Sequence, residues 1–88
     1  MAVVSVTTSL TTLAAGSASR ATTAVLVVPN AAIWVSKADT LTANTAATGG
    51  IPLAAGQAYE DILESGQALY ARTATGTANA AVETGAAD

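Results

Sequence analysis

The sequence contains no cysteine, no histidine and no phenylalanine. The absence of cysteine excludes disulfides, and the absence of both cysteine and histidine excludes the usual structural zinc sites. A serine hydrolase also needs a base, most often histidine, to activate its nucleophile. We therefore expect no metal, no cofactor and no enzymatic activity.

Charge is also scarce. Only 10% of the 88 residues are charged, against about a quarter in an average soluble domain. The three cations, Arg20, Lys37 and Arg72, are scattered along the chain, and the net charge is −3. Binding to nucleic acid depends on clustered Lys and Arg, so we expect no nucleic-acid partner.

No long hydrophobic run is present. The longest strongly apolar stretch, residues 24–28, is followed by Pro29 and Asn30. A membrane-spanning helix needs about 20 apolar residues, so no membrane association is expected. Alanine supplies much of the apolar composition, so a domain of this size buries little area and has a thin stability margin. Without disulfides or a metal, the remaining way to stabilise so small a fold is oligomerisation or docking onto a larger body.

The hydrophobic pattern has a period of two throughout, with turn residues every 8–12 positions, which predicts an all-β fold. We expect a small antiparallel β-sandwich or barrel of six to eight short strands. The segment 57–63 carries acidic residues that suit a helix, but its short length between two glycines favours a strand. The expected strands are 3–6, a short one within 10–19 before or around a turn at Gly16, 22–28, 32–37, 51–53, 57–63, 68–73 and 78–84.

The strands at 22–28 and 32–37 are separated by a turn signal at Pro29 and Asn30, which predicts a hairpin. For domain organisation, we expect an N-terminal strand or partner-contacting arm at 1–19, the sandwich at 20–84 and a frayed tail at 85–88. The Ala/Thr-rich segments 7–22 and 40–50 are also compatible with disorder.

The only acidic cluster is formed by Glu60, Asp61 and Glu64. Glycoside hydrolysis needs two carboxyl groups facing each other across a cleft, and no second acidic group elsewhere opposes this cluster. The spacing also differs from that of a calcium-binding loop. We interpret the cluster as a solvated or interface edge.

Three aromatic residues, Trp34, Tyr59 and Tyr70, allow two interpretations. Flat rings with polar groups can form a platform for a carbohydrate. The same side chains are also common in cores and subunit contacts. With so few large residues in the chain, packing is the favoured interpretation, and a glycan ligand is the alternative.

Apolar residues occupy both faces of the strand 22–28, which indicates that one face packs on the second sheet and the other on a partner. The neutral loop 40–50 and the arm at 1–13 are expected to contribute to this contact. The candidate partner-binding residues are Val25, Val27, Trp34, Thr42, Asn44 and Tyr70.

Several elements in order along residues 20–84 resemble small virion proteins of tailed bacteriophages. These elements are Arg20, a strand ending at Asn30, a second strand at 33–36, the Gly-Ile-Pro-Leu segment at 50–56, Leu-Tyr-Ala at 69–71 and a last strand at 74–82. The chain departs from the pattern at Pro29 and at Ser36, where a glycine is expected.

The resemblance implies a β-sandwich module on the phage particle, with no catalytic residue. The expected function is a capsid decoration (cement) protein on the outside of the head, made in the host cytoplasm. Its partners would be the major capsid protein or other virion proteins, and it would form a homo-oligomer, with a trimer favoured. The alternative is a glycan-binding or assembly module of a fibre, tail or neck.

Overall fold

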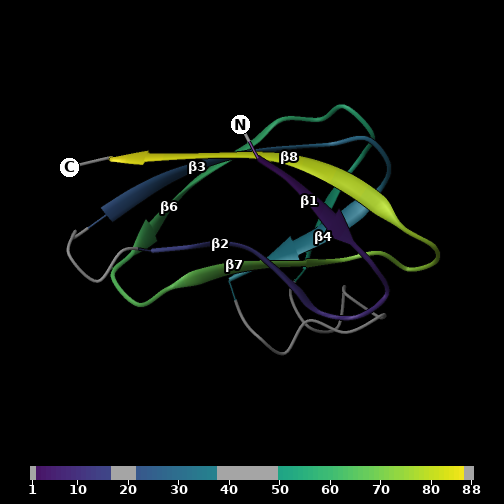
Figure 1. Cartoon of the computed structure of the whole chain (residues 1–88), viewed down its shortest axis with the longest axis horizontal. Helices are drawn as coiled ribbons and strands as arrows, with labels where there is room; N and C mark the ends of the chain where they lie inside the picture. The colour runs from purple at the N-terminus through teal and green to yellow at the C-terminus, as the bar shows by residue number, and fades with distance from the viewer. Residues whose placement is uncertain (1, 17–21, 38–49, 87–88) are drawn as a thin grey trace.

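Two antiparallel sheets of four strands form the part of the chain that the structure, a computed structural model, describes: residues 2–16, 22–37 and 50–86. The strands lie in two layers (Figure 1). In chain order they are β1 (Ala2–Val6), β2 (Thr11–Ala15), β3 (Thr22–Pro29), β4 (Ile33–Ser36), β5 (Ile51–Leu53), β6 (Tyr59–Glu64), β7 (Ala68–Arg72) and β8 (Ala78–Ala86). Sheet A has the order β1-β8-β3-β6, and sheet B has the order β2-β7-β4-β5.

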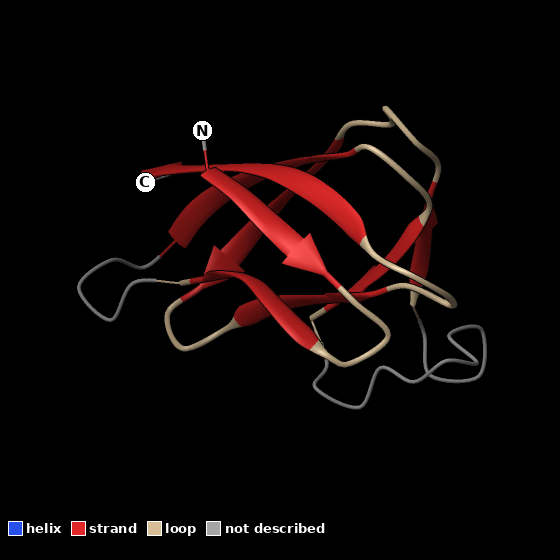
Figure 2. Cartoon of the chain, turned by 45° about the vertical axis from the view of Figure 1, so that its right-hand side comes forward, coloured by secondary structure: helices blue, strands red, loops and turns tan. Residues whose placement is uncertain are grey.

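The predicted fold class is confirmed. The described residues form strands, turns and loops but no helix, as Figure 2 shows. The segment for which a helix was considered, 57–63, forms β6 as a strand. The predicted strands and the observed ones agree to within a few residues at their ends.

The strand pairing is nested. β1 pairs with β8, β2 with β7, β3 with β6, and β4 with β5, all antiparallel. The chain is therefore folded back on itself like one long hairpin that is wrapped into two sheets. This is the strand order of a jelly roll, an eight-stranded double-sheet architecture.

The predicted hairpin around Pro29 and Asn30 is wrong. β3 pairs with β6 and β8, whereas β4 pairs with β5 and β7, so the turn carries the chain from sheet A to sheet B. The Asn30 side-chain oxygen accepts a hydrogen bond from the Asn79 backbone N–H at 2.9 Å, and the Asn30 N–H donates to the Asn79 carbonyl at 2.8 Å. This contact with the start of β8 fixes the crossing.

Residues 2–16 contribute two strands to the sandwich and are not a separate arm. β1 forms one edge of sheet A and β2 one edge of sheet B, so the sandwich begins well before residue 20. At the other end, β8 continues to Ala86, which places residues 85 and 86 within a strand. Residues 87–88 lie outside the described part of the chain.

The core lies between the sheets and follows the alternation of the strands. Along β3, buried and half-exposed residues alternate without interruption. The largest fully buried side chains are Ile33, Leu63, Leu69, Val6, Val27, Val35 and Pro29. In β2 the register with β7 shifts between Thr12 and Ala14, and this bulge allows the consecutive residues Leu13 and Ala14 both to be buried.

Two turns are built in the same way. In one, the Gln57 N–H donates to the Ala54 carbonyl, and the Gln57 Oε1 accepts from the Ala54 N–H. Gln67 makes the equivalent two bonds with Glu64. The residue before each glutamine is a glycine with positive φ, a conformation that side chains disfavour. The dipeptide Gly-Gln thus closes both turns.

Candidate functional site

The outer face of sheet A presents a row of apolar side chains to solvent. We call it the apolar strip. Cross-strand register aligns Val28 with Ala81 and Val3, and Ala24 with Ile62. Val3 is 70% exposed and Ile62 is 44% exposed, although both are large hydrophobic side chains. The members of the strip are Val3, Ala24, Leu26, Val28, Ile62 and Ala81.

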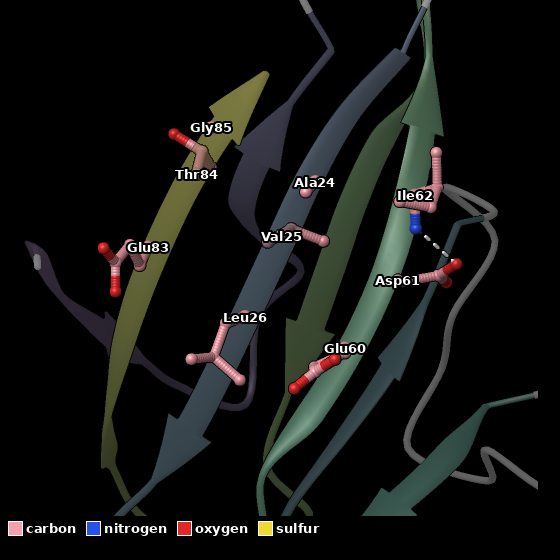
Figure 3. A pocket seen from close by; sticks show the side chains of 9 residues that line it. All are labelled: Ala24, Val25, Leu26, Glu60, Asp61, Ile62, Glu83, Thr84 and Gly85. Carbon is pink, nitrogen blue, oxygen red and sulfur yellow. Dashed lines mark hydrogen bonds between the residues drawn. The ribbon is translucent and has the colours of Figure 1, made fainter. Parts of the chain in front are cut away.

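A shallow groove of about 560 Å³ lies within the apolar strip (Figure 3). Its floor is formed where the small residues Ala24 and Gly85 lie side by side in the register of β3 and β8. Larger side chains border it: Leu26, Ile62, Glu60 and Glu83. The groove exists because two residues with almost no side chain are surrounded by four larger ones.

Carboxylates flank the middle of the groove. Leu26 pairs with Glu83 on one side and with Glu60 on the other, and Figure 3 shows its side chain between the two carboxylates. Of the two cations that the structure describes, Arg72 donates to the Thr8 carbonyl and Lys37 pairs with a different acid. Within the described residues, this face therefore combines an apolar centre with negative charge.

A polar cluster closes the side of the sandwich next to the groove. Lys37, just after β4, places its Nζ 3.1 Å from Asp61 Oδ1 on β6. The Tyr59 hydroxyl donates to Asp61 Oδ2 at 2.6 Å. Asp61 Oδ1 also accepts the Ile62 N–H at 2.7 Å, and Lys37 Nζ donates to the Ile62 carbonyl at 3.0 Å. One ion pair thus connects the two sheets and occupies the backbone groups of Ile62.

The pKa values in this cluster are shifted by its contacts. Burial raises the pKa of Tyr59, and the hydrogen bond to Asp61 and the negative charge of that carboxylate raise it further, to about 12. Burial also acts to raise the pKa of Asp61. The hydrogen bonds from Tyr59, the Ile62 N–H and Lys37, together with the Lys37 charge, outweigh burial, so the pKa of Asp61 is lowered. The cluster is a structural connection between charged and polar groups of the two sheets.

Two of the candidate partner-binding residues are part of the core. Val25 is 2% exposed and Val27 is 0% exposed, so neither side chain can contact a partner. The two valines lie on the inward face of the strand. A period of two in the sequence assigns residues to two opposite faces, but it does not indicate which face packs on the second sheet. The outward apolar residues of β3 are Ala24, Leu26 and Val28.

The remaining candidates divide into two groups. Thr42 and Asn44, together with residues 40–49 of the predicted contact loop, lie outside the described residues. Trp34 and Tyr70 both point away from the core on sheet B, since each alternates with buried neighbours. Trp34 pairs with Arg72, and Tyr70 lies two residues from Arg72 on β7. Trp34 and Tyr70 are therefore diagonal neighbours on adjacent strands, and the Cα atoms of such neighbours are about 7–8 Å apart.

No family model, no curated protein and no solved structure matches this chain. Among the described residues, no group of three or more His, Cys, Asp or Glu side chains could hold a metal ion. The described part of the chain also contains no helix with the length and apolar character that crossing a membrane would require.

Sequence reasoning missed several residues of the outer face. Val3, Ile62 and Glu83 were assigned to strands, but no signal in the sequence places them on one face with Leu26. Their common face depends on β8 and β6 pairing with opposite edges of β3, and on β1 pairing with β8. The period of two did predict that the Leu26 side chain lies on the opposite face of its strand from Val25 and Val27.

Proposed function

We propose that this chain is a structural subunit of a bacteriophage particle, a decoration protein that binds the outside of the head and stabilises the shell. The observation that carries the proposal is the apolar strip, in which the large hydrophobic side chains of Val3 and Ile62 are exposed. Exposed apolar surface of this kind marks a contact site. The resemblance of residues 20–84 to phage virion proteins supports a phage particle as the assembly.

The charges beside the strip define the shell surface that would fit it. Glu60 and Glu83 lie on either side of Leu26, so a complementary surface places an apolar side chain over the groove and Lys or Arg beside it. Two copies of this face in direct contact would bring carboxylates together, which is unfavourable. The expected occupant of the groove is therefore a basic and apolar patch of the major capsid protein.

Small size makes such a subunit suited to a lattice. A partner that binds only the folded form stabilises it by mass action. Many equivalent contacts on a symmetric shell also raise the effective affinity beyond that of a single contact. The jelly-roll architecture occurs in viral capsid domains and in lectins, so the fold is compatible with the proposal.

The test uses purified heads that lack the decoration protein, mixed with the purified chain, and measures occupancy after sedimentation of the heads. We expect the unmodified chain to bind and Leu26→Asp, which points outward, to reduce occupancy at least about tenfold. Thr12→Asp is the matched control, because Thr12 is exposed on sheet B. Equal occupancy for Leu26→Asp and the unmodified chain, or no binding by either, would overturn the proposal.

Electrostatic complementarity is tested separately. Glu60→Lys combined with Glu83→Lys keeps the apolar strip and reverses the charges that flank it. We expect this double variant to lose binding, and we expect binding of the unmodified chain to weaken with rising salt. Undiminished binding of the reversed variant would mean that the shell contact does not use this face.

A second candidate function is glycan binding through sheet B. The specific observation in its favour is that Trp34 and Tyr70 lie as diagonal neighbours on the outer face. The measurement is binding to a glycan array, with Trp34→Ala checked for folding by circular dichroism. Loss of a reproducible glycan signal in a folded variant would favour this function. Absence of any signal for the unmodified chain would eliminate it.

A further inference from the structure

The four edge strands of the sandwich differ in how they are protected. β1 and β6 are the edges of sheet A, and β2 and β5 are the edges of sheet B. An edge strand presents unpaired N–H and C=O groups that can pair with another chain. Proteins usually block this pairing with charges, proline, bulges or very short strands.

Three of the edges carry such a block. On β6, the Ile62 N–H donates to Asp61 and the Ile62 carbonyl accepts from Lys37, so the ion pair occupies the outward backbone groups of Ile62 in the middle of the strand. β5 has only three residues and contains Pro52. β2 is interrupted by the bulge between Thr12 and Ala14.

β1 carries none of these blocks. Its five residues, Ala-Val-Val-Ser-Val, include no proline and no charged side chain, and they pair with β8 without a register shift. A regular, neutral and β-branched edge of this kind is a template for strand addition.

We propose that β1 pairs antiparallel with β1 of a second copy, which joins two copies of sheet A into one continuous eight-stranded sheet. A two-fold axis at Val4 places Ala2 opposite Val6 and Val3 opposite Ser5. Residues that face inward in one copy then face inward in the other. No like charges meet at any of these positions, and the apolar strips of the two copies lie on the same side of the joined sheet.

The arrangement of edges argues for a pair of copies rather than the trimer that the sequence analysis favoured. A ring needs two different complementary surfaces on each copy, whereas a two-fold contact uses one surface twice. Among the four described edges, only β1 carries none of the blocks described above. The contact expected is therefore the one in which β1 of one copy pairs with β1 of the other. The inference rests on the edges alone and stands independently of the proposed shell binding.

The contact is small. Pairing of two five-residue strands buries well below the ~1,200–2,000 Å² of a standard stable interface. We therefore expect a dimer whose population rises steeply with concentration and which is favoured where copies are held close together. Sedimentation equilibrium over a series of concentrations up to the millimolar range measures this directly.

The decisive variants change Val3 and Ser5, which are both exposed on the outer face. In V3K/S5K, the lysine at position 3 of one copy faces the lysine at position 5 of the other, and this happens twice by symmetry. We expect the dissociation constant to rise about tenfold. In V3K/S5E the facing residues have opposite charge, and we expect dimerisation to return. This charge exchange tests the register as well as the contact.

The control is E60K/I62K, which introduces two lysines on β6, the blocked edge of the same sheet. We expect its dimerisation to match that of the unmodified chain. Circular dichroism melting verifies that each variant is folded. A monomer at every concentration, a trimeric mass, or equal association of V3K/S5K and the unmodified chain would each overturn the proposal. None of these results bears on binding to heads, which is measured through Leu26.

Discussion

Lys37 and Asp61 form an ion pair between the two sheets, with Nζ and Oδ1 3.1 Å apart. Lys37 follows β4 of sheet B, and Asp61 lies in β6, the edge of sheet A. The pair therefore connects the two sheets at one side of the sandwich through a charged contact. Asp61 is the centre of the cluster because it also accepts hydrogen bonds from Tyr59 and the Ile62 N–H.

Asp61→Asn is expected to destabilise the fold by about 1–3 kcal/mol, because hydrogen bonds to a charged group are stronger than neutral ones. The measurement is chemical denaturation at neutral pH. Glu60→Gln is the control, since Glu60 is exposed on the other face of the same strand. A loss of stability no larger than that of the control would show that the ion pair is fully screened.

The same cluster makes stability depend on pH at both extremes. The pKa of Asp61 is lowered on folding, so its contribution is complete above its unfolded pKa and disappears as pH falls through the folded value. The pKa of Tyr59 is raised from 10.0 to about 12. Between pH 10 and pH 12 the Tyr59 hydroxyl ionises in the unfolded chain but not in the folded one. The free energy of unfolding therefore falls with rising pH in this range.

Tyr59→Phe removes the alkaline part of this dependence. We expect the melting temperature of the unmodified chain to fall between pH 10 and pH 12, and the slope to be smaller in the variant. Thermal melts followed by circular dichroism across this range give both slopes. Tyr70→Phe is the matched control, and identical slopes for Tyr59→Phe and the unmodified chain would contradict the expectation.

Gly16→Ala is expected to destabilise the chain by about 1–3 kcal/mol, the usual cost of overpacking. A Cβ at Gly16 would overlap the carbonyl oxygen of Glu64, which is backbone and cannot rotate away. Gly16 also donates its N–H to the Gln67 carbonyl at 2.7 Å. Gly85→Ala is the control, because a Cβ there meets nothing within 4 Å. Equal melting temperatures for the two variants would argue against the close approach.

Leu69→Ala is expected to cost about 2–5 kcal/mol, because it opens a cavity at a fully buried position. That loss is a large share of the stability of a small domain. Ile62→Ala, at a residue that is 44% exposed, is expected to cost well under half as much. Denaturant titrations of both variants provide the comparison, and a smaller loss for Leu69→Ala would mean that Leu69 is not a core residue.

The corrected placement of Val25 and Val27 changes how the face of β3 must be tested. An aspartate at either position would be buried without a partner, and the chain would unfold. Loss of particle binding by such a variant would then say nothing about a contact surface. Leu26 is the informative position on this strand, because its side chain points away from the core.

The sequence by itself determined the fold class and most strand positions, since a period of two and the glycine-marked turns are local properties of the chain. It also separated the two faces of each strand. Only the tertiary structure decided which strands pair, that β3 and β4 belong to different sheets, and that Glu60, Leu26 and Glu83 share one row. Strand pairing joins residues far apart in sequence, and many pairings satisfy the same alternation. The choice among them is made by the packing of the whole core and by contacts such as that of Lys37 with Asp61, which no local pattern encodes.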